Sequence, residues 1–174
     1  SAEVRPVDSV NLSFPLLGIV NTVDVKVGDE VTAGQAIATL DTVILEARVA
    51  EAEANVAAGD AQYAYLKRVG VSQDQLDAAQ ADIDRAQAIL EQNKATLAEA
   101  TLATPINGTV VTVDITPGET ANPGQVIIVV ADLSHLHIET TDLSERDIPA
   151  VQIGQTASVS VDALDESFTG RVVD

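Results

Sequence analysis

The sequence contains an internal repeat, in which residues 12–37 match residues 102–127 without a gap at an offset of 90 positions. The glycines of the first copy, Gly18, Gly28 and Gly34, each align with a glycine in the second. Further identities fall on Leu12, Pro15, Val20, Thr22, Val23, Asp24, Gln35 and Ile37. Chance supplies a few such matches but not a whole register, so the chain holds two copies of one structural unit.

Each copy has the pattern of short β-strands joined by tight turns. Apolar and polar residues alternate over 23–27 and again over 111–115, as in a half-buried strand, and turn-forming Gly and Pro residues follow both runs. Neither copy has enough strands to close a core alone. We therefore expect residues 10–41 and 102–132 to form one small β-sandwich together.

Residues 42–101, between the two copies, have a helical composition instead. They contain no proline, and Ala, Glu, Gln, Asp and Leu fill most of the segment. Mostly apolar residues recur in two runs at alternating spacings of four and three, which is the heptad pattern of a coiled coil. The runs are Leu45, Val49, Ala52, Val56, Gly59, Tyr63 and Leu66, then Leu76, Ala79, Ile83, Ala86, Leu90, Asn93, Leu97 and Ala100.

The two runs fit one antiparallel register. If the chain folds back near residue 71, partners have numbers that sum to 142, so that Gly59, for example, faces Ile83. Large residues then face small ones, as close packing requires. Asn93 is the polar exception, and a single polar residue in such a seam can fix the register at some cost in stability. We expect a long coiled-coil hairpin with its tip near residues 67–75.

The residues that follow the second copy return to a strand pattern. "GQTASVSVD" alternates strongly, and "FTGRVVD" begins another strand before the sequence stops. Such a run of strands is typical of a barrel or sandwich. Residues 133–174 are therefore expected to be an incomplete β-barrel domain, which residues 1–9 could join.

The composition excludes several classes of function. The formal net charge is −18, so repulsion between like charges speaks against nucleic acid as a partner. The chain has no cysteine, which rules out disulfide and thiol chemistry. No apolar run reaches the roughly 18 residues of a membrane span. We therefore expect any membrane anchor to lie outside this segment.

A carrier-like β-domain split by a coiled-coil hairpin and followed by barrel strands resembles the membrane fusion proteins, or periplasmic adaptor subunits, of the HlyD-like family. Pro105 and Gly108 stand where this family has an Ala-Pro-x-x-Gly signature, with Thr104 in place of the usual alanine. The resemblance implies a mixed α and β fold: a split biotinyl- or lipoyl-like β-sandwich, an inserted antiparallel coiled-coil α-hairpin, and part of a β-barrel domain. The segments that carry the likeness are residues 18–41, 100–132 and 143–172.

The resemblance also implies a role in export without catalysis. Such adaptors serve tripartite efflux pumps and secretion systems, where they are periplasmic or extracytoplasmic and anchored to the inner membrane. They link an inner-membrane transporter, of the ABC or RND type, to an exit channel, and several copies pack side by side into a ring. The alternative is an envelope scaffold that uses the hairpin to bind another partner without export.

The hairpin tip is the predicted site of partner docking. Many pump adaptors carry an Arg, a Leu and a Ser at fixed spacing there. Ser72 matches the serine, but Ala61 and Tyr65 stand at the other two positions. The sequence therefore leaves open whether the tip binds an outer-membrane channel or another protein. The predicted docking residues are Lys67, Arg68, Val69, Gly70, Val71, Ser72 and Gln73, with Gly70 ending the first helix and Ser72 capping the second.

No cofactor, metal or catalytic site is expected. In a lipoyl or biotinyl carrier the modified lysine would lie near Thr42, and threonine cannot form the amide link to either cofactor. His135 and His137 share one face of a strand, but zinc usually needs three or four ligands and no cysteine is available. A nucleophile with its base is not indicated, because the sequence has no elbow motif and no further histidine.

Overall fold

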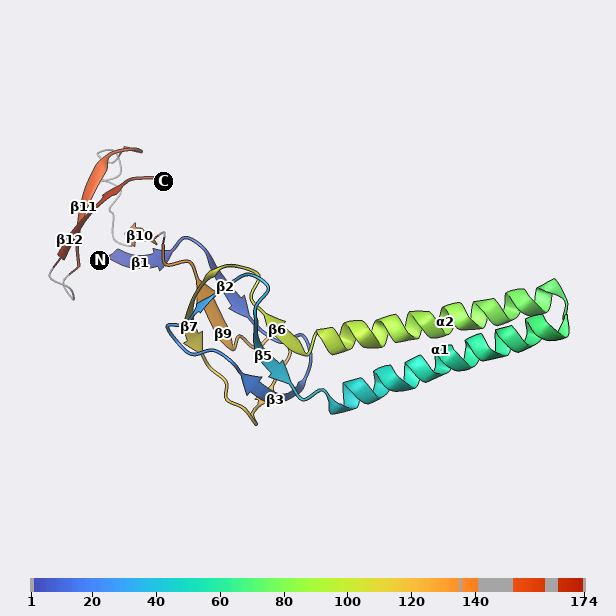
Figure 1. Ribbon diagram of the computed structural model, residues 1–174. Helices are drawn as coiled ribbons and strands as arrows, with labels where there is room; N and C mark the ends of the chain where they lie inside the picture. Colours follow the sequence, from blue (N-terminus) through green and yellow to red (C-terminus); the bar gives the residue numbers. More distant parts are fainter. Residues whose placement is uncertain (1, 135, 141–151, 162–165, 174) are drawn as a thin grey trace. The chain divides into compact units, whose positions relative to one another are not determined.

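The computed structural model describes residues 2–134, 136–140, 152–161 and 166–173 (Figure 1). The chain divides into two compact units. The larger unit is Pro6–His135, and the smaller one combines Ser1–Arg5 with Leu136–Asp174. The larger unit contains the β-sandwich and the helical hairpin.

Two four-stranded antiparallel sheets make up the sandwich, with strand orders β2-β9-β7-β4 and β6-β5-β3-β8. The strands are Ser9–Leu12 (β2), Gly18–Val23 (β3), Glu30–Val31 (β4), Ala36–Leu40 (β5), Thr101–Ala103 (β6), Gly108–Val113 (β7), Thr120–Ala121 (β8) and Ile128–Ala131 (β9).

Each sheet mixes strands from both copies of the repeat. In one sheet, β3 and β5 of the first copy pair with each other, while their outer neighbours β8 and β6 come from the second copy. In the other sheet, β7 and β9 of the second copy lie between β4 and β2 of the first. An approximate two-fold axis therefore relates the copies, and neither copy can complete a sheet without the other.

In each copy, a crossing turn carries the chain from one sheet to the other, between β3 and β4 or between β7 and β8. Hydrogen bonds in these two turns follow the same two-fold relation. Gly28 N donates to Val110 O at 2.8 Å, and Gly118 N donates to Val20 O at 2.8 Å. The φ angles of these glycines are +97° and +92°, in the left-handed region where glycine carries no steric penalty. Gly28 and Gly118, which the repeat keeps, thus lie at the turns that exchange strands between the copies.

The core between the sheets is almost entirely aliphatic, with Phe14 as its one aromatic residue among those described. Phe14 and Thr104 occupy equivalent positions of the two copies, and both are fully buried. Ala100, just after the second helix, belongs to this core, and Leu45 in the first helix packs against it. These contacts fix the base of the hairpin to the sandwich.

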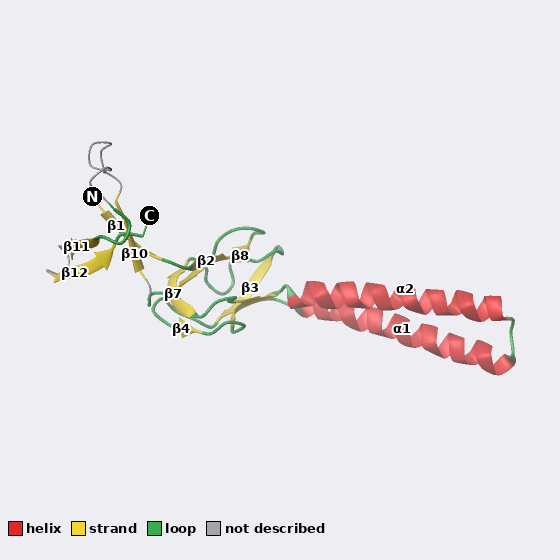
Figure 2. Ribbon diagram, turned by 90° about the horizontal axis from the view of Figure 1, so that it is seen from above, coloured by secondary structure: helices red, strands yellow, loops and turns green. Residues whose placement is uncertain are grey.

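The segment between β5 and β6 forms two antiparallel helices, α1 (Val43–Val69) and α2 (Gln73–Ala98) (Figures 1 and 2). In α1, all seven residues of the first heptad run are buried or half-buried, and every other residue of the helix is exposed. In α2, the residues of the second run are likewise buried or half-buried. Thr96 is the one further residue of this helix that is half-buried, and all others are exposed. The predicted coiled-coil hairpin is confirmed.

The contacts across the seam agree with the predicted register. A Cβ atom placed on Gly59 would lie 3.9 Å from Ile83 Cβ, so these two residues face each other. The half-buried Asn93 donates its Nδ2 hydrogen to Arg48 O of the opposite helix at 3.4 Å. The polar residue in the seam is therefore partnered across the helix pair.

The smaller unit contains two short two-stranded sheets. In one, β1 (Ala2–Pro6) pairs with β10 (Leu136–Thr140). In the other, β11 (Thr156–Val161) and β12 (Glu166–Arg171) are antiparallel. The predicted fold class, a split sandwich with an inserted hairpin followed by further strands, is confirmed.

Candidate docking site

The hairpin tip is a connection of three residues, 70–72, between two capped helices. Gly70 has a φ of 74°, and its N–H donates to Leu66 O at 3.2 Å, which ends α1. Ser72 is the N-cap of α2, and its N–H donates to Gln75 Oε1 at 3.2 Å, one half of a capping box. Both helix ends are thus closed by local hydrogen bonds.

The structure places all the predicted docking residues at this end of the hairpin. Lys67, Arg68 and Val69 lie in the last turn of α1, and Gln73 is the first residue of α2. The helices therefore extend into the predicted tip, and only residues 70–72 lie between them. Most of the tip residues therefore belong to the ends of two packed helices.

Tyr65, Arg68 and Val69 lie on one face of α1 at the tip, because their spacings are three and four residues. We call these three residues the tip face. Tyr65 and Val69 are 50% and 51% exposed. Arg68 Cζ lies 5.8 Å from the centroid of the Tyr65 ring, within cation–π range. Tyr65 is not among the docking residues predicted from the sequence, although its spacing from Arg68 indicates a shared face.

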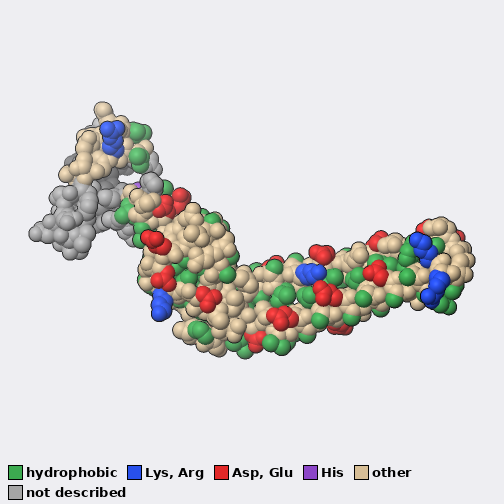
Figure 3. Space-filling model, viewed as in Figure 1, with side chains coloured by type: hydrophobic (Ala, Val, Ile, Leu, Met, Phe, Trp, Pro, Cys, Tyr) green, Lys and Arg blue, Asp and Glu red, His purple; other side chains and the backbone are tan. Residues whose placement is uncertain are grey.

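The tip is also locally basic. Within the described part of the chain, neither Lys67 nor Arg68 has a carboxylate partner, whereas Arg85 Nη1 lies 2.9 Å from Asp82 Oδ1 midway along the hairpin. Figure 3 shows basic side chains gathered at the end of the hairpin and acidic ones spread along its length. The chain as a whole has a net charge of −18.

A second exposed surface lies at the base of the hairpin. We call it the base patch. Its side chains are 54% to 70% exposed. Ile19 O accepts a hydrogen bond from Asp41 N at 2.8 Å, which places β3 beside the start of α1. The patch consists of Leu17, Ile19, Val43 and Ile44.

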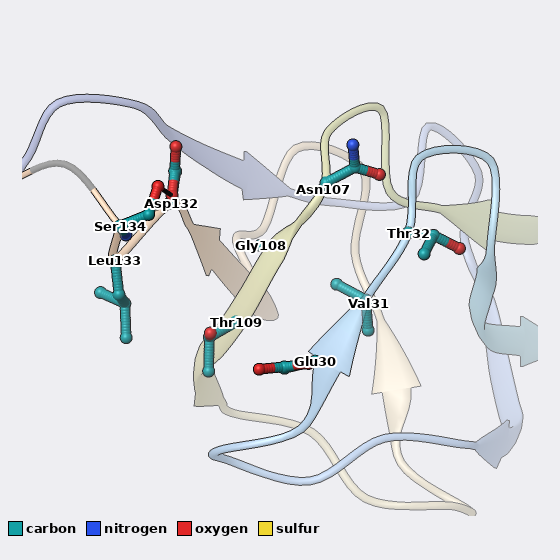
Figure 4. A pocket seen from close by; sticks show the side chains of 9 residues that line it. All are labelled: Glu30, Val31, Thr32, Asn107, Gly108, Thr109, Asp132, Leu133 and Ser134. Atoms are coloured by element: carbon teal, nitrogen blue, oxygen red, sulfur yellow. Dashed lines mark hydrogen bonds between the residues drawn. The ribbon is translucent and has the colours of Figure 1, made fainter.

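The two-fold counterpart of the base patch is more polar. Asn107 and Thr109 stand where the patch has Leu17 and Ile19. They line a groove of about 530 Å³ beside β4 and β7 (Figure 4). The full lining is Glu30, Val31, Thr32, Asn107, Gly108, Thr109, Asp132, Leu133 and Ser134.

The two carboxylates of this groove do not converge on one point. Figure 4 shows Glu30 near Thr109, and Asp132 beside Ser134 on the other side of the groove. Asp132 Oδ1 accepts hydrogen bonds from the N–H and the hydroxyl of Ser134 at 2.8 and 2.6 Å. Among the described residues, no three His, Cys, Asp or Glu side chains are grouped closely enough to hold a metal ion.

The other residues singled out in the sequence lie apart from the tip. Thr42 directly precedes α1, and its Oγ1 donates to Glu46 Oε1 at 2.7 Å, so the residue expected at the carrier-lysine position lies at the start of the hairpin. His137 lies in β10, and His135 lies outside the described residues, so the pair cannot be placed. Neither helix has the length and apolar character needed to cross a bilayer, as judged over the described residues.

A sandwich of exchanged strands, interrupted by an antiparallel helical hairpin, defines a barrel-sandwich hybrid of the type found in adaptor proteins. The family described as CzcB-like, barrel-sandwich hybrid domain matches residues 9–132, and the chain belongs to this family. An uncharacterized protein of Haemophilus influenzae is 31% identical over 176 residues, which cover 97% of this chain and 45% of that protein. The chain thus spans about half the length of the curated relative it matches.

Solved structures of adaptor proteins share the fold. A MacA–MexA chimeric protein containing the Pseudomonas aeruginosa MexA α-hairpin domain superposes with a TM-score of 0.86 at 28% identity, over 99% of this chain and 65% of the chimera. The membrane fusion protein Spr0693 of Streptococcus pneumoniae R6 gives 0.77 at 22% identity, over 99% and 80%. The periplasmic adaptor protein EmrA gives 0.73 at 15% identity, over 99% and 86%. The resemblance to membrane fusion proteins is confirmed.

Proposed function

We propose that this protein is a periplasmic or extracytoplasmic adaptor that links an inner-membrane efflux or secretion transporter to an exit channel. The observation that carries the proposal is the hairpin. Its helices of 27 and 26 residues pack in one register and end in a capped tip. At about 1.5 Å per residue they span roughly 40 Å. An arm of this length suits a protein that bridges two partners, and no catalysis is assigned to it.

The partners follow from this role. The tip, with Lys67 to Gln73, docks onto the exit channel, and the transporter is of the ABC or RND type. In the full-length protein an anchor holds the adaptor at the inner membrane. Two of the proteins that share the fold are a membrane fusion protein and a periplasmic adaptor protein, which supports this assignment.

Contact between copies in the assembled complex is assigned to the base patch. Each chain carries a net charge of −18, so copies repel one another over most of their surface. A stable contact therefore needs a place where burial of apolar area outweighs that repulsion. The base patch offers four exposed large apolar side chains, two at the start of β3 and two at the start of α1.

An envelope scaffold without an export role is the second candidate. It is favoured by one observation: Ala61 and Tyr65 stand at the positions where many pump adaptors carry Arg and Leu. A scaffold would use the same hairpin to bind a different partner.

Deletion of the hairpin separates the two candidates. Residues 43–98 are replaced by a tight turn, which β5 and β6 can accommodate because they pair antiparallel. Cells that lack the natural gene are supplied with the full-length or the shortened protein. Tolerance to a panel of antibiotics, dyes and metal salts is measured, together with the secreted proteins. The adaptor role predicts that the shortened protein is folded but exports no better than no protein, and unchanged export would contradict it.

A further inference from the structure

We propose that the tip face, together with Lys67, docks onto a protein surface that is acidic. This inference rests on the proposed function, in which the tip is the docking end of the hairpin. It adds the chemistry of the surface that the tip recognises.

The first argument is the local charge. The chain has 27 acidic and nine basic residues, so an average stretch of its surface is acidic. Residues 61–73 contain Lys67 and Arg68 and no acidic residue, and Asp74 follows in the first turn of α2. Both cations are exposed, and neither has a carboxylate partner within the part of the chain that the structure describes. A complementary partner surface therefore carries negative charge.

Helix stability alone does not account for these two cations. Basic residues in the last turn of a helix do interact favourably with its carboxyl end. However, α2 also has a carboxyl end, and it has no basic residue in its last turn. The placement of the two cations is thus particular to the tip.

The second argument is the exposed tyrosine. Aromatic residues make up only 2% of the chain. Phe14 is fully buried and Tyr63 is half-buried in the seam, whereas Tyr65 is 50% exposed beneath the Arg68 guanidinium. Tyr and Arg are the residues enriched at energetic hot spots of protein interfaces. A guanidinium is attracted to the face of an aromatic ring, and its fork of N–H groups matches a carboxylate.

An anionic membrane surface fits the tip less well. Lipid recognition by charge uses clusters of about four to eight Lys and Arg residues. The tip has two, on a chain whose net charge of −18 is repelled by such a surface. The observations therefore favour a protein that presents Asp and Glu side chains.

Photocrosslinking in living cells tests this inference. The full-length protein carries a photoreactive side chain at Gln73, and the captured segment is identified by mass spectrometry. Arg68→Glu is compared with Arg48→Glu, which makes the same charge change on the same helix, at an exposed residue that likewise has no carboxylate partner among those described. Arg68→Gln removes the positive charge without adding an anion at the carboxyl end of α1. It replaces Arg68→Glu in the comparison if that variant frays the helix. Tyr65→Ala removes the stacking partner.

The inference predicts that Arg68→Glu lowers the yield of the crosslinked product by about tenfold or more, corresponding to 1.4 kcal/mol per factor of ten. Arg68→Gln and Tyr65→Ala lower it less, and Arg48→Glu leaves it unchanged. The captured segment contains Asp or Glu, and replacing that residue by Lys in the partner restores capture by Arg68→Glu.

Equal capture by the unmodified protein and Arg68→Glu would overturn the inference, as would a captured segment without acidic residues or a lipid adduct. The proposed function can fail separately. If the charge-dependent product contains an acidic segment of a protein that is not an exit channel, the adaptor role is wrong and the acidic docking surface stands.

Discussion

At Gly18 and Gly108, equivalent positions of the repeat have different neighbours. A Cβ atom on Gly108 would lie 2.6 Å from Ala131 O, which is backbone, whereas on Gly18 it would lie 2.9 Å from Leu40 Cδ1, the end of a flexible side chain. We expect Gly108→Ala to lower the free energy of unfolding by roughly 3 kcal/mol and Gly18→Ala by about 1 kcal/mol. Urea denaturation of the two variants measures the difference, and equal effects would contradict it.

Thr104 is the one buried polar side chain among the described residues. Its Oγ1 donates to Ile106 O at 2.8 Å and accepts from Ile106 N at 3.4 Å. Thr104→Val keeps the shape of the side chain and removes the hydroxyl, so we expect it to lower the free energy of unfolding by about 1–2 kcal/mol. Thr104→Ser keeps the hydroxyl and isolates the contribution of the methyl group. A Thr104→Val variant as stable as the natural protein would show that the hydroxyl contributes nothing.

At the scale of residues, the sequence predicts the structural role of positions that are identical in both copies of the repeat. It does not predict the role of positions that differ between the copies. The glycines at the crossing turns follow directly from the alignment. The burial of Thr104 does not, because its partner in the alignment is Phe14 and the two have no chemistry in common. The sequence also leaves the burial of Ile19 undecided, because this residue lies between Gly18 and Val20 in an apolar segment that could belong to the core. Its exposure is decided by the pairing of β3 in the complete sheet.

At the scale of elements, the sequence predicts the hairpin with its register and predicts that the two copies form one sandwich, but it does not predict the order of the strands. Heptad spacing is a local signal, and the register follows from two runs that must face each other. The exchange of β6 and β8 into the sheet of β3 and β5 has no local signal. Strand patterns indicate which face is buried, but they do not indicate which strand is the neighbour.

The cysteine-free chain allows a direct test of the hairpin register. A Cβ atom introduced at Gly59 would lie 3.9 Å from Ile83 Cβ. This distance lies within the Cβ-to-Cβ range of disulfides. Gly59→Cys with Ile83→Cys is therefore expected to form an intramolecular disulfide on mild oxidation. Gly59→Cys with Ala79→Cys, one turn away, is the matched control and is expected to remain reduced. Intact mass distinguishes the two, and the reverse pattern would show a hairpin shifted by a turn.

At the scale of the whole molecule, the two-fold sandwich has two equivalent places of attachment. The strands β5 and β6 lead into the hairpin, and their counterparts β9 and β2 lead into the smaller unit (Figure 1). One repeated motif therefore connects two different parts of an adaptor. The symmetry is broken at the surface, where the apolar base patch faces solvent and its counterpart is a polar groove.

This broken symmetry supplies a test of contact between copies. Ile19→Glu places a charge in the base patch, and Thr109→Glu places the same charge at the equivalent position of the groove. We expect Ile19→Glu to weaken self-association of the full-length protein by about tenfold or more, because a contact of 1.4 kcal/mol is worth that factor. Thr109→Glu is expected to have little effect. Sedimentation of the detergent-solubilised proteins measures both, and equal behaviour would show that copies meet elsewhere.

The central claim is that the hairpin tip meets an exit channel. The most direct measurement is photocrosslinking in living cells with the probe at Ser72 of the otherwise unmodified full-length protein, and with the probe at the exposed Leu133 of the sandwich as the control position. The adaptor role predicts capture of an outer-membrane channel, or the exit duct of the export system, from Ser72 and not from Leu133. Capture from Ser72 of only the protein's own copies, or of an envelope protein without a part in export, would contradict it.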